Sequence, residues 1–386
     1  MRHERQLQLL DRLAKAGPRR TGLYAEASTI VPASAYTDPQ RFENELDFLF
    51  RGGVVVFALS CELPQPGDHQ AQTFGGIPLL VVRQPDRSLR AMVNACRHRA
   101  APLVENGRSG HGTVFQCPYH AWTYELDGTL RNRPGSAGAF DDVTVNCDLH
   151  QVAVAERYGM ILVRPRGREP IDVDAVLAGA EDDLGHFGLA DHVHIETRVI
   201  ERDLNWKLLL DTFCESYHIR TLHKDTLAPY FDSTCVIHES FGPNQLSCGF
   251  RNTIDREFDK PRDERSLLPY GTIQYFIVPN LLIVHQIDHI EMWRLEPLAV
   301  DRTRATVSVY APGPPTRDKP TEYYVKNLDL LLEVTDAEDF ALMARIQRSL
   351  GSGSIPELVY GRIEPPLIRL HAAINDLLAG ARPAGE

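Results

Sequence analysis

The chain contains Cys96-Arg97-His98-Arg99 and, further on, Cys117-Pro118-Tyr119-His120-Ala121-Trp122, and these two stretches decide the fold of its first half. Each offers one thiol and one imidazole from a short segment, so the two segments can close around one small inorganic centre. Thiolates hold iron–sulfur clusters, and histidine ligands on one of the irons raise the reduction potential. Two cysteines and two histidines also suit tetrahedral zinc, although zinc sites usually pair like ligands, as in C-x2-C. The mixed pairs therefore favour an iron–sulfur cluster over structural zinc.

Short β-type runs separated by Gly, Pro and Asp surround both stretches. Two of these runs, Ala91–Asn94 and Thr113–Gln116, lead directly into the cysteine segments. This spacing is typical of a small all-β domain, in which loops at strand ends present ligands at a surface. We expect this domain to span residues 36–166 and to end near Arg164-Pro165-Arg166-Gly167. Its other predicted strands cover residues 53–60, 79–82, 151–155 and 159–163.

Residues 167–386 show a different pattern, with longer strands and helices. An antiparallel sheet wrapped around a long C-terminal helix is an α+β arrangement. Residues 1–35 precede both domains, and the charged start of the chain with its spaced leucines predicts an amphipathic helix that packs on the second domain, rather than a signal peptide. The second domain has predicted helices at 172–185, 206–223 and 336–350, and predicted strands at 194–203, 235–239, 245–250, 271–278, 281–288, 290–297 and 303–311.

A polar stripe marks the predicted helix at 206–223. Asp211, Glu215 and His218 fall at i, i+4 and i+7, which is one face of a helix. The flanking residues are apolar almost all round, which indicates a buried helix, so these ionisable groups need partners or a metal; the alternative is a solvated polar stripe. We take Asp211 and Glu215 as candidate catalytic residues. His218 and His223 can bind one ion only if the helix ends or distorts between them.

Two histidines alone leave zinc, iron and no metal open. A carboxylate that completes a facial triad would indicate non-haem Fe(II) and oxygen chemistry. Asp339 is the best candidate, because the residues at its i+4, i+7 and i+11 positions are apolar and should face inward. Thr335 and Glu338 fit a capping box, which predicts that the helix begins there. The alternative for Asp339 is a favourable interaction with the helix dipole.

Both constellations, in this order, resemble those of the catalytic α subunits of Rieske non-haem iron oxygenases, the aromatic ring-hydroxylating oxygenase family, over nearly the whole chain. The resemblance implies an N-terminal all-β Rieske [2Fe-2S] domain and a C-terminal helix-grip (START-like) catalytic domain. It implies that one cluster iron is held by two cysteines and the other by two histidines, with a mononuclear Fe(II) in the second domain. The implied cluster ligands are Cys96, Cys117, His98 and His120, and the implied Fe(II) ligands are His218, His223 and Asp339.

The resemblance also implies an activity. It is that of an oxygenase component that uses O2 and electrons from a separate NAD(P)H-dependent reductase, possibly with a ferredoxin, to mono- or dioxygenate a small organic, aromatic substrate in aromatic hydrocarbon catabolism. The alternative is oxidative N- or O-dealkylation or C–N cleavage of a quaternary ammonium or similar compound. A head-to-tail homotrimer is implied, in which Glu215 bridges His218 and a Rieske histidine of the neighbour; the family commonly has aspartate at this position. A non-catalytic Rieske electron carrier and a zinc-binding helix-grip protein are the rival interpretations.

Composition limits the partners. A net charge of −11 without a basic cluster argues against nucleic acid, and the longest apolar runs have strand length, too short for a membrane span. The other cysteines show no paired spacing, which indicates a reducing compartment and a cytoplasmic protein. There is no G-x-G-x-x-G after a strand, so we expect the reductase to be another polypeptide. The candidates for lining the substrate pocket are Phe250, Tyr275, Phe276, Ile277, His285, Met292 and Trp293.

Overall fold

The computed structural model describes residues 1–17 and 20–380. The chain forms two compact units, Met1–Leu46 together with Leu177–Glu386, and Asp47–Val176. The N-terminal segment therefore belongs to the same unit as the C-terminal half, and the units divide after Leu46 and Val176, where the sequence analysis placed boundaries after residues 35 and 166. The predicted N-terminal segment (1–35) and second domain (167–386) include residues 18–19 and 381–386, which lie outside the part of the chain that the structure describes. No described helix is long and apolar enough to cross a membrane.

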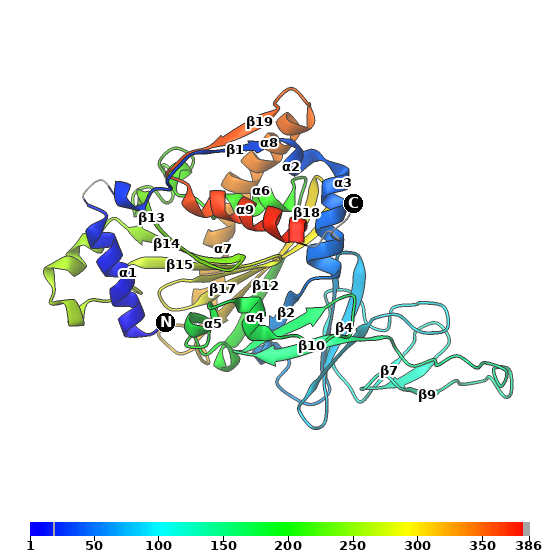
Figure 1. The fold of residues 1–386 in the computed structure, drawn as a ribbon. Coiled ribbons are helices and arrows are strands. Elements are labelled where there is room, and N and C mark those ends of the chain that lie inside the picture. The colour runs from blue at the N-terminus through cyan, green and yellow to red at the C-terminus, as the bar shows by residue number, and fades with distance from the viewer. Residues whose placement is uncertain (18–19, 381–386) are drawn as a thin grey trace. The chain divides into compact units, whose positions relative to one another are not determined.

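The unit Asp47–Val176 consists of two antiparallel sheets around a small apolar core (Figure 1). The larger sheet has the strand order β2-β11-β10-β5-β4-β3-β6, and the smaller one has the order β7-β8-β9. The all-β prediction is confirmed, while β3, β6, β8 and β9 were not predicted. The bounds are β2 Val55–Leu59, β3 Asp68–Phe74, β4 Ile77–Arg83, β5 Leu89–Val93, β6 Ser109–His111, β7 Val114–Gln116, β8 Thr123–Glu125, β9 Leu130–Asn132, β10 Gln151–Arg157 and β11 Met160–Arg164.

The other unit is built on one antiparallel sheet with the order β12-β18-β17-β16-β15-β14-β13, so the α+β prediction is confirmed (Figure 1). A small separate sheet pairs β1 with β19 and ties the N-terminal segment to the C-terminal region. The bounds are β1 Thr29–Pro32, β12 Val193–Arg202, β13 Phe231–Phe241, β14 Asn244–Arg251, β15 Gly271–Ile277, β16 Leu281–His285, β17 Ile290–Ala299, β18 Arg302–Ala311 and β19 Glu357–Tyr360.

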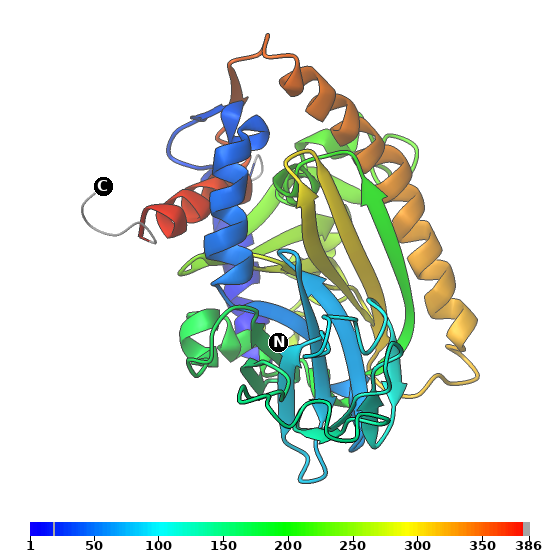
Figure 2. The same cartoon turned by 90° about the vertical axis from the view of Figure 1, so that its right-hand side faces the viewer.

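A long helical rod, α7 (Thr321–Val334), a π-helical segment η8 (Thr335–Phe340) and α8 (Ala341–Gly351), runs beside the sheet (Figure 2). The predicted helix start at Thr335 was wrong, because the Thr335 hydroxyl donates back to the carbonyl of Leu331 as a mid-helix residue does. The other helical bounds are α1 His3–Lys15, α2 Ser34–Thr37, α3 Pro39–Glu45, α4 Val173–Leu177, α5 Glu181–Leu184, α6 Trp206–Asp211, η5 Tyr217–Arg220 and α9 Pro365–Gly380.

Helix α6 is much shorter than the predicted helix at 206–223. The side chain of Asn205 caps its start by accepting from the Lys207 amide. The helix ends at Asp211, and the chain resumes a helical turn only at η5. The prediction that Asp211, Glu215 and His218 share one helical face was therefore wrong, because no continuous helix joins them.

Candidate active site

The two cysteine segments of the β unit, residues 96–101 and 117–122, have the same backbone geometry, and we call them the cluster loops. In each loop the cysteine carbonyl accepts a hydrogen bond from an alanine amide four residues later, at 2.8 Å for Ala100 and 3.0 Å for Ala121. Both alanines have positive φ, 57° and 58°, a conformation that is uncommon for residues other than glycine. The loops therefore form a matched pair that presents equivalent positions.

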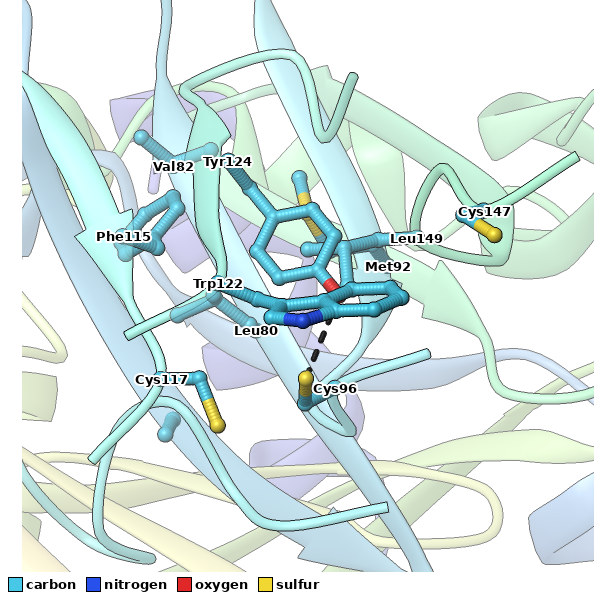
Figure 3. Packing of buried hydrophobic residues seen from close by; sticks show 11 residues of the cluster. Leu80, Val82, Met92, Cys96, Phe115, Cys117, Trp122, Tyr124, Cys147 and Leu149 are labelled. Carbon is cyan, nitrogen blue, oxygen red and sulfur yellow. Dashed lines mark hydrogen bonds between the residues drawn. The ribbon is translucent and has the colours of Figure 1, made fainter. Parts of the chain in front are cut away.

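Both thiols are buried and neither forms a disulfide. The Tyr124 hydroxyl lies 3.2 Å from the sulfur of Cys96 and accepts a hydrogen bond from the Arg97 amide at 2.9 Å. Figure 3 shows the sulfurs of Cys96 and Cys117 on neighbouring loops, with Tyr124 and Trp122 beside them. Burial raises the pKa of the Cys96 thiol, and a bound metal would favour its thiolate form. The sequence offered no signal for the contact from Tyr124.

The histidines of the cluster loops meet at the surface. The Nδ1 atoms of His98 and His120 lie 3.2 Å apart, and His98 stacks on the indole of Trp122 with ring centroids 5.0 Å apart. Burial lowers the pKa of His98, which favours the neutral imidazole that ligates metals. Two nitrogens that each lie about 2.1 Å from one tetrahedral ion are separated by about 3.4 Å. Two thiols and two facing Nδ1 atoms thus fit a [2Fe-2S] centre with one pair of ligands on each iron.

In the other unit, His218, His223 and Asp339 form a candidate metal site, which we call the triad; their ligand atoms all lie within 4.8 Å of one another. The Nε2 atoms of His218 and His223 lie 3.5 Å and 3.0 Å from Asp339 Oδ1. Among the described residues, this buried Oδ1 finds no hydrogen-bond partner. A buried carboxylate oxygen that faces two imidazole nitrogens at these distances fits a divalent ion held by two histidines and one carboxylate.

Two glutamates hold the outer nitrogens of the triad histidines. The Nδ1 atom of His218 bonds to Glu215, whose other oxygen accepts from the His218 amide at 3.1 Å. The Nδ1 atom of His223 bonds to Glu338, and Asp339 and Glu338 raise the pKa of His223 against the effect of burial. Such carboxylates fix the tautomer so that Nε2 is free for the metal. The sequence analysis interpreted Glu338 as a capping residue and missed this contact.

Asp339 reaches the site from the π-helical segment η8. In such a segment the extra residue per turn changes the direction of the side chains, and segments of this kind occur at functional sites. The neighbouring Asp336 instead pairs with Arg202. The inward face predicted from α-helical spacing thus led to Asp339, which the structure places beside both histidines although the local helix is not α-helical.

Asp211 is separate from the triad. It accepts hydrogen bonds from Tyr36 and lies 3.0 Å from His371 Nε2, and Tyr36 also contacts Tyr360. All four side chains are buried, and they tie α6 to α2, β19 and α9. Asp211 is not among the described residues that line the pocket. Its hydrogen bonds instead hold these buried elements together.

The triad lies in the wall of a cavity of about 380 Å³, between the sheet, η5 and α7. None of the seven strand residues predicted to line the substrate pocket is in the described lining of this cavity. Five of them, Phe250, Tyr275, Ile277, His285 and Met292, lie in cross-strand register on the opposite face of the sheet. Phe276 and Trp293 share the pocket face, but Phe213 and Phe340 pack against the Trp293 ring. The alternate strand positions, including Gln274 and Glu291, line the cavity.

Comparisons with known proteins agree with both halves of the fold. The family of Rieske [2Fe-2S] domains matches residues 53–168, and the family of ring hydroxylating alpha subunits (catalytic domain) matches residues 189–380. A quaternary ammonium Rieske monooxygenase of known structure has a TM-score of 0.76 and 22% identity, covering 90% of this chain and 95% of its own.

Two curated relatives show more local similarity. The glycine betaine monooxygenase oxygenase subunit of Chromohalobacter salexigens is 32% identical over 199 residues, which are 51% of this chain and 44% of that protein. The chloroplastic choline monooxygenase of Amaranthus tricolor is 24% identical over 331 residues, which are 84% of this chain and 72% of that protein. The match to the first relative thus spans less than half of its length. With its Rieske and catalytic domains both matched in order, the chain belongs to the Rieske non-haem iron oxygenases, as a ring-hydroxylating-type α subunit.

Proposed function

We propose that this chain is the oxygenase component of a Rieske monooxygenase or dioxygenase system that oxidises a small organic substrate with O2. The observation that carries the proposal is that two histidine Nε2 atoms converge on one buried oxygen of Asp339 in the wall of the cavity, and that this oxygen has no hydrogen-bond partner among the described residues. An electron carrier without catalytic function would need neither this cavity nor a second metal site. We therefore disfavour the carrier, and the four ligands of the cluster loops favour a redox cluster over zinc.

Each site residue then has a role. Cys96 and Cys117 would hold one iron of the [2Fe-2S] cluster, and His98 and His120 the other. The triad, His218, His223 and Asp339, would hold Fe(II). When bound, these groups supply single-electron transfer and O2 activation. Monooxygenation converts C–H to C–OH and releases water, consuming O2, two electrons and two protons.

The protein's own side chains prepare this chemistry. Glu215 and Glu338 would keep both triad histidines in the tautomer that binds metal. Asp211, with its Tyr36 and His371 contacts, would hold α6 in place rather than touch the substrate. Phe213 and the aliphatic residues of α7 that line the cavity would exclude water from the reacting carbon.

For the substrate, we favour the alternative of dealkylation or C–N cleavage of a charged amine over oxidation of an aromatic hydrocarbon. The two curated relatives are named for glycine betaine and choline, which are quaternary ammonium compounds. Beside Phe231, the sheet wall of the cavity carries the polar residues Ser247, Gln274 and Glu291, which can bind a charged amine.

Electrons would come from a separate NAD(P)H-dependent reductase, with or without a ferredoxin, in the cytoplasm. The edge of the cluster suits such a partner, because His120 is exposed and Tyr119 beside it is 56% exposed. We also propose a homotrimer in which the cluster of one protomer reduces the triad iron of the next. Tyr217, next to His218, is 65% exposed and could contact that neighbour.

The test is metal analysis and turnover of the aerobically purified holoenzyme and its His223→Ala variant. We expect the parent to contain cluster iron, sulfide and additional iron, and to consume O2 with NADH and a surrogate reductase. His223→Ala should retain the Rieske absorption and EPR signals but lose the additional iron and all product. A colourless zinc protein, or unchanged iron and product in the variant, would contradict the proposal.

A further inference from the structure

One row of residues crosses the sheet beneath the cavity. Ser247 on β14 lies opposite Gln274 on β15, Gln274 opposite Val284 on β16, and Val284 opposite Glu291 on β17. Directly opposed residues project from the same face of a sheet, and all four line the cavity. This row therefore brings a hydroxyl, an amide and a carboxylate to the wall that the substrate meets.

Glu291 has an unused hydrogen-bonding oxygen. The residue is 3% exposed, and its Oε1 accepts from Gln286 Nε2 at 3.2 Å. Within the described residues, the buried Oε2 finds no hydrogen-bond partner. A buried carboxylate oxygen without a donor is strongly unfavourable. A metal ion at the triad would give the unpartnered oxygen of Asp339 a partner but not this one, because Glu291 is not part of the triad.

The nearest charged group, His289, faces the Oε1 atom of Glu291, and no donor among the described residues reaches Oε2. His289 Nε2 lies 3.6 Å from Glu291 Oε1, beyond hydrogen-bond distance, while its Nδ1 bonds to Asp288 at 2.8 Å. The carboxylate of Asp288 forms an ion pair with the Lys319 ammonium at 2.7 Å and accepts a hydrogen bond from the Tyr323 hydroxyl. Arg251 also lines the cavity but stacks over Phe231. It lies four residues along β14 from Ser247, about 13 Å away at the rise of a strand.

We propose that Glu291 is the recognition residue for a cationic substrate that carries at least one N–H, such as a protonated secondary or tertiary amine, and that this N–H donates to Glu291 Oε2. A hydrocarbon would leave that oxygen unpaired, and a quaternary ammonium group would supply charge but no donor. The inference rests on the proposed function and narrows it, because it separates this chain's substrate from the quaternary compounds for which its relatives are named. The cavity volume suits a ligand of about ten non-hydrogen atoms.

Three probes of matched shape test the proposal by binding alone. They are benzyldimethylamine, which is protonated at neutral pH, benzyltrimethylammonium, which lacks the N–H, and neutral isobutylbenzene. Equilibrium dialysis against the anaerobic holoenzyme measures each affinity without turnover. We expect benzyldimethylamine to bind about tenfold more tightly than benzyltrimethylammonium, because its N–H makes a charge-assisted hydrogen bond to Oε2, which the quaternary probe leaves unpaired. In Glu291→Gln the ratio of these two affinities should shrink at least fivefold, because the variant loses one charge-assisted hydrogen bond.

Glu296→Gln is the matched control, because Glu296 lies on the same strand, pairs with Arg304 and is absent from the described lining of the cavity. It should retain the parent's order of affinities. Equal or tighter binding of the quaternary probe to the parent would overturn the proposal even if Glu291→Gln fails to fold. If a folded Glu291→Gln variant still prefers benzyldimethylamine over benzyltrimethylammonium as strongly as the parent does, the proposal is also overturned. A parent that binds the probes as expected but has no iron at the triad would contradict the proposed function and leave the recognition role of Glu291 supported.

Discussion

At the scale of single residues, the two triad histidines share one arrangement despite different surroundings. His223 is almost completely buried, with a side chain 1% exposed, whereas that of His218 is 21% exposed. Each imidazole nevertheless has a glutamate on Nδ1 and Asp339 facing Nε2. The glutamates come from different elements, one preceding η5 and one within η8. The orientation of both imidazoles therefore depends on carboxylates that lie outside the triad.

Removing one of these carboxylates should weaken the metal site without destroying it. Glu338→Gln keeps the size of the side chain but loses its charge, and iron affinity should fall about 10- to 100-fold. Iron retained after dialysis against a graded chelator series measures this change. Glu333→Gln, at an exposed position on α7, should retain iron as the parent does. Equal iron retention in the two variants would show that Glu338 does not support His223.

The Tyr124 hydroxyl should tune the cluster. Hydrogen bonds to the cluster sulfurs are among the factors that set its reduction potential, and a donor near Cys96 stabilises the extra negative charge of the reduced state. Tyr124→Phe should therefore lower the reduction potential, as measured by an EPR-monitored redox titration. Tyr119→Phe is the control, because that hydroxyl contacts Arg99 instead. An unchanged reduction potential in Tyr124→Phe would show that the Tyr124 hydroxyl does not tune the cluster.

At the scale of elements, α3 and α6 are joined by a buried ionic contact. Glu45, which is 0% exposed, accepts from the Lys207 ammonium at 2.5 Å and from the Trp206 indole at 2.8 Å. Arg41 pairs with its other oxygen. Removal of one partner from such a buried pair leaves an uncompensated charge. This contact fixes the start of the segment that carries Asp211, Glu215 and the triad histidines.

Glu45→Ala should lower the free energy of unfolding by about 3–5 kcal/mol, because Lys207 loses its buried counter-charge. Chemical denaturation of the holoenzyme, followed by circular dichroism, gives this value. Gln40→Ala, at an exposed position of the same helix, should change it by less than about 0.5 kcal/mol. If Glu45→Ala lowers the free energy of unfolding no more than Gln40→Ala does, the buried ion pair does not stabilise the fold.

The same pair predicts a pH dependence. Burial lowers the pKa of Lys207 from 10.5 to about 8, against the effect of Glu45. The folded protein thus releases this proton more easily than the unfolded chain, so Lys207 should increase stability as pH rises from about 8 to 10.5. The Lys207→Met profile should lack that increment, so the difference in stability between parent and variant should grow across this pH range. Parallel profiles across this range would contradict the lowered pKa.

Some of the elements could be predicted from sequence patterns alone, and others could not. Strands β12 and β14–β18 were predicted closely, because apolar runs between turn residues define strands locally. Alternation fixed which strand residues share a face but not which face lines the cavity, so Tyr275 was chosen where Gln274 is correct. The sequence analysis required a helix end or distortion between His218 and His223, and η5 ends there, at Arg220. The break after Asp211 and the π segment at Asp339 were not predictable, since they depend on tertiary contacts. The candidate ligand residues could be chosen from sequence because their types and spacing are rare, whereas the contacts of Glu338 and Tyr124 form only in the folded chain.

At the scale of the whole molecule, the cluster loops and the triad belong to different compact units. Each unit has its own core and its own candidate metal site, so the loss of one site should leave the other assembled. This independence allows the proposed electron route to be tested with two complementary variants. Cys96→Ser should lack the cluster but keep the triad, and His223→Ala should keep the cluster but lack triad iron.

Each variant alone should be inactive. If electrons pass between neighbouring protomers of a closed ring, co-expressed mixed assemblies should regain activity wherever an intact cluster faces an intact triad. For random mixing in equal amounts, about one quarter of the directed interfaces meet this condition, so about a quarter of the parent activity should return. Co-expression of His218→Ala with His223→Ala controls for nonspecific rescue, because no protomer then has a complete triad. Native mass spectrometry verifies mixing, and mixed assemblies without activity would show that the electron path does not run from one protomer to the next.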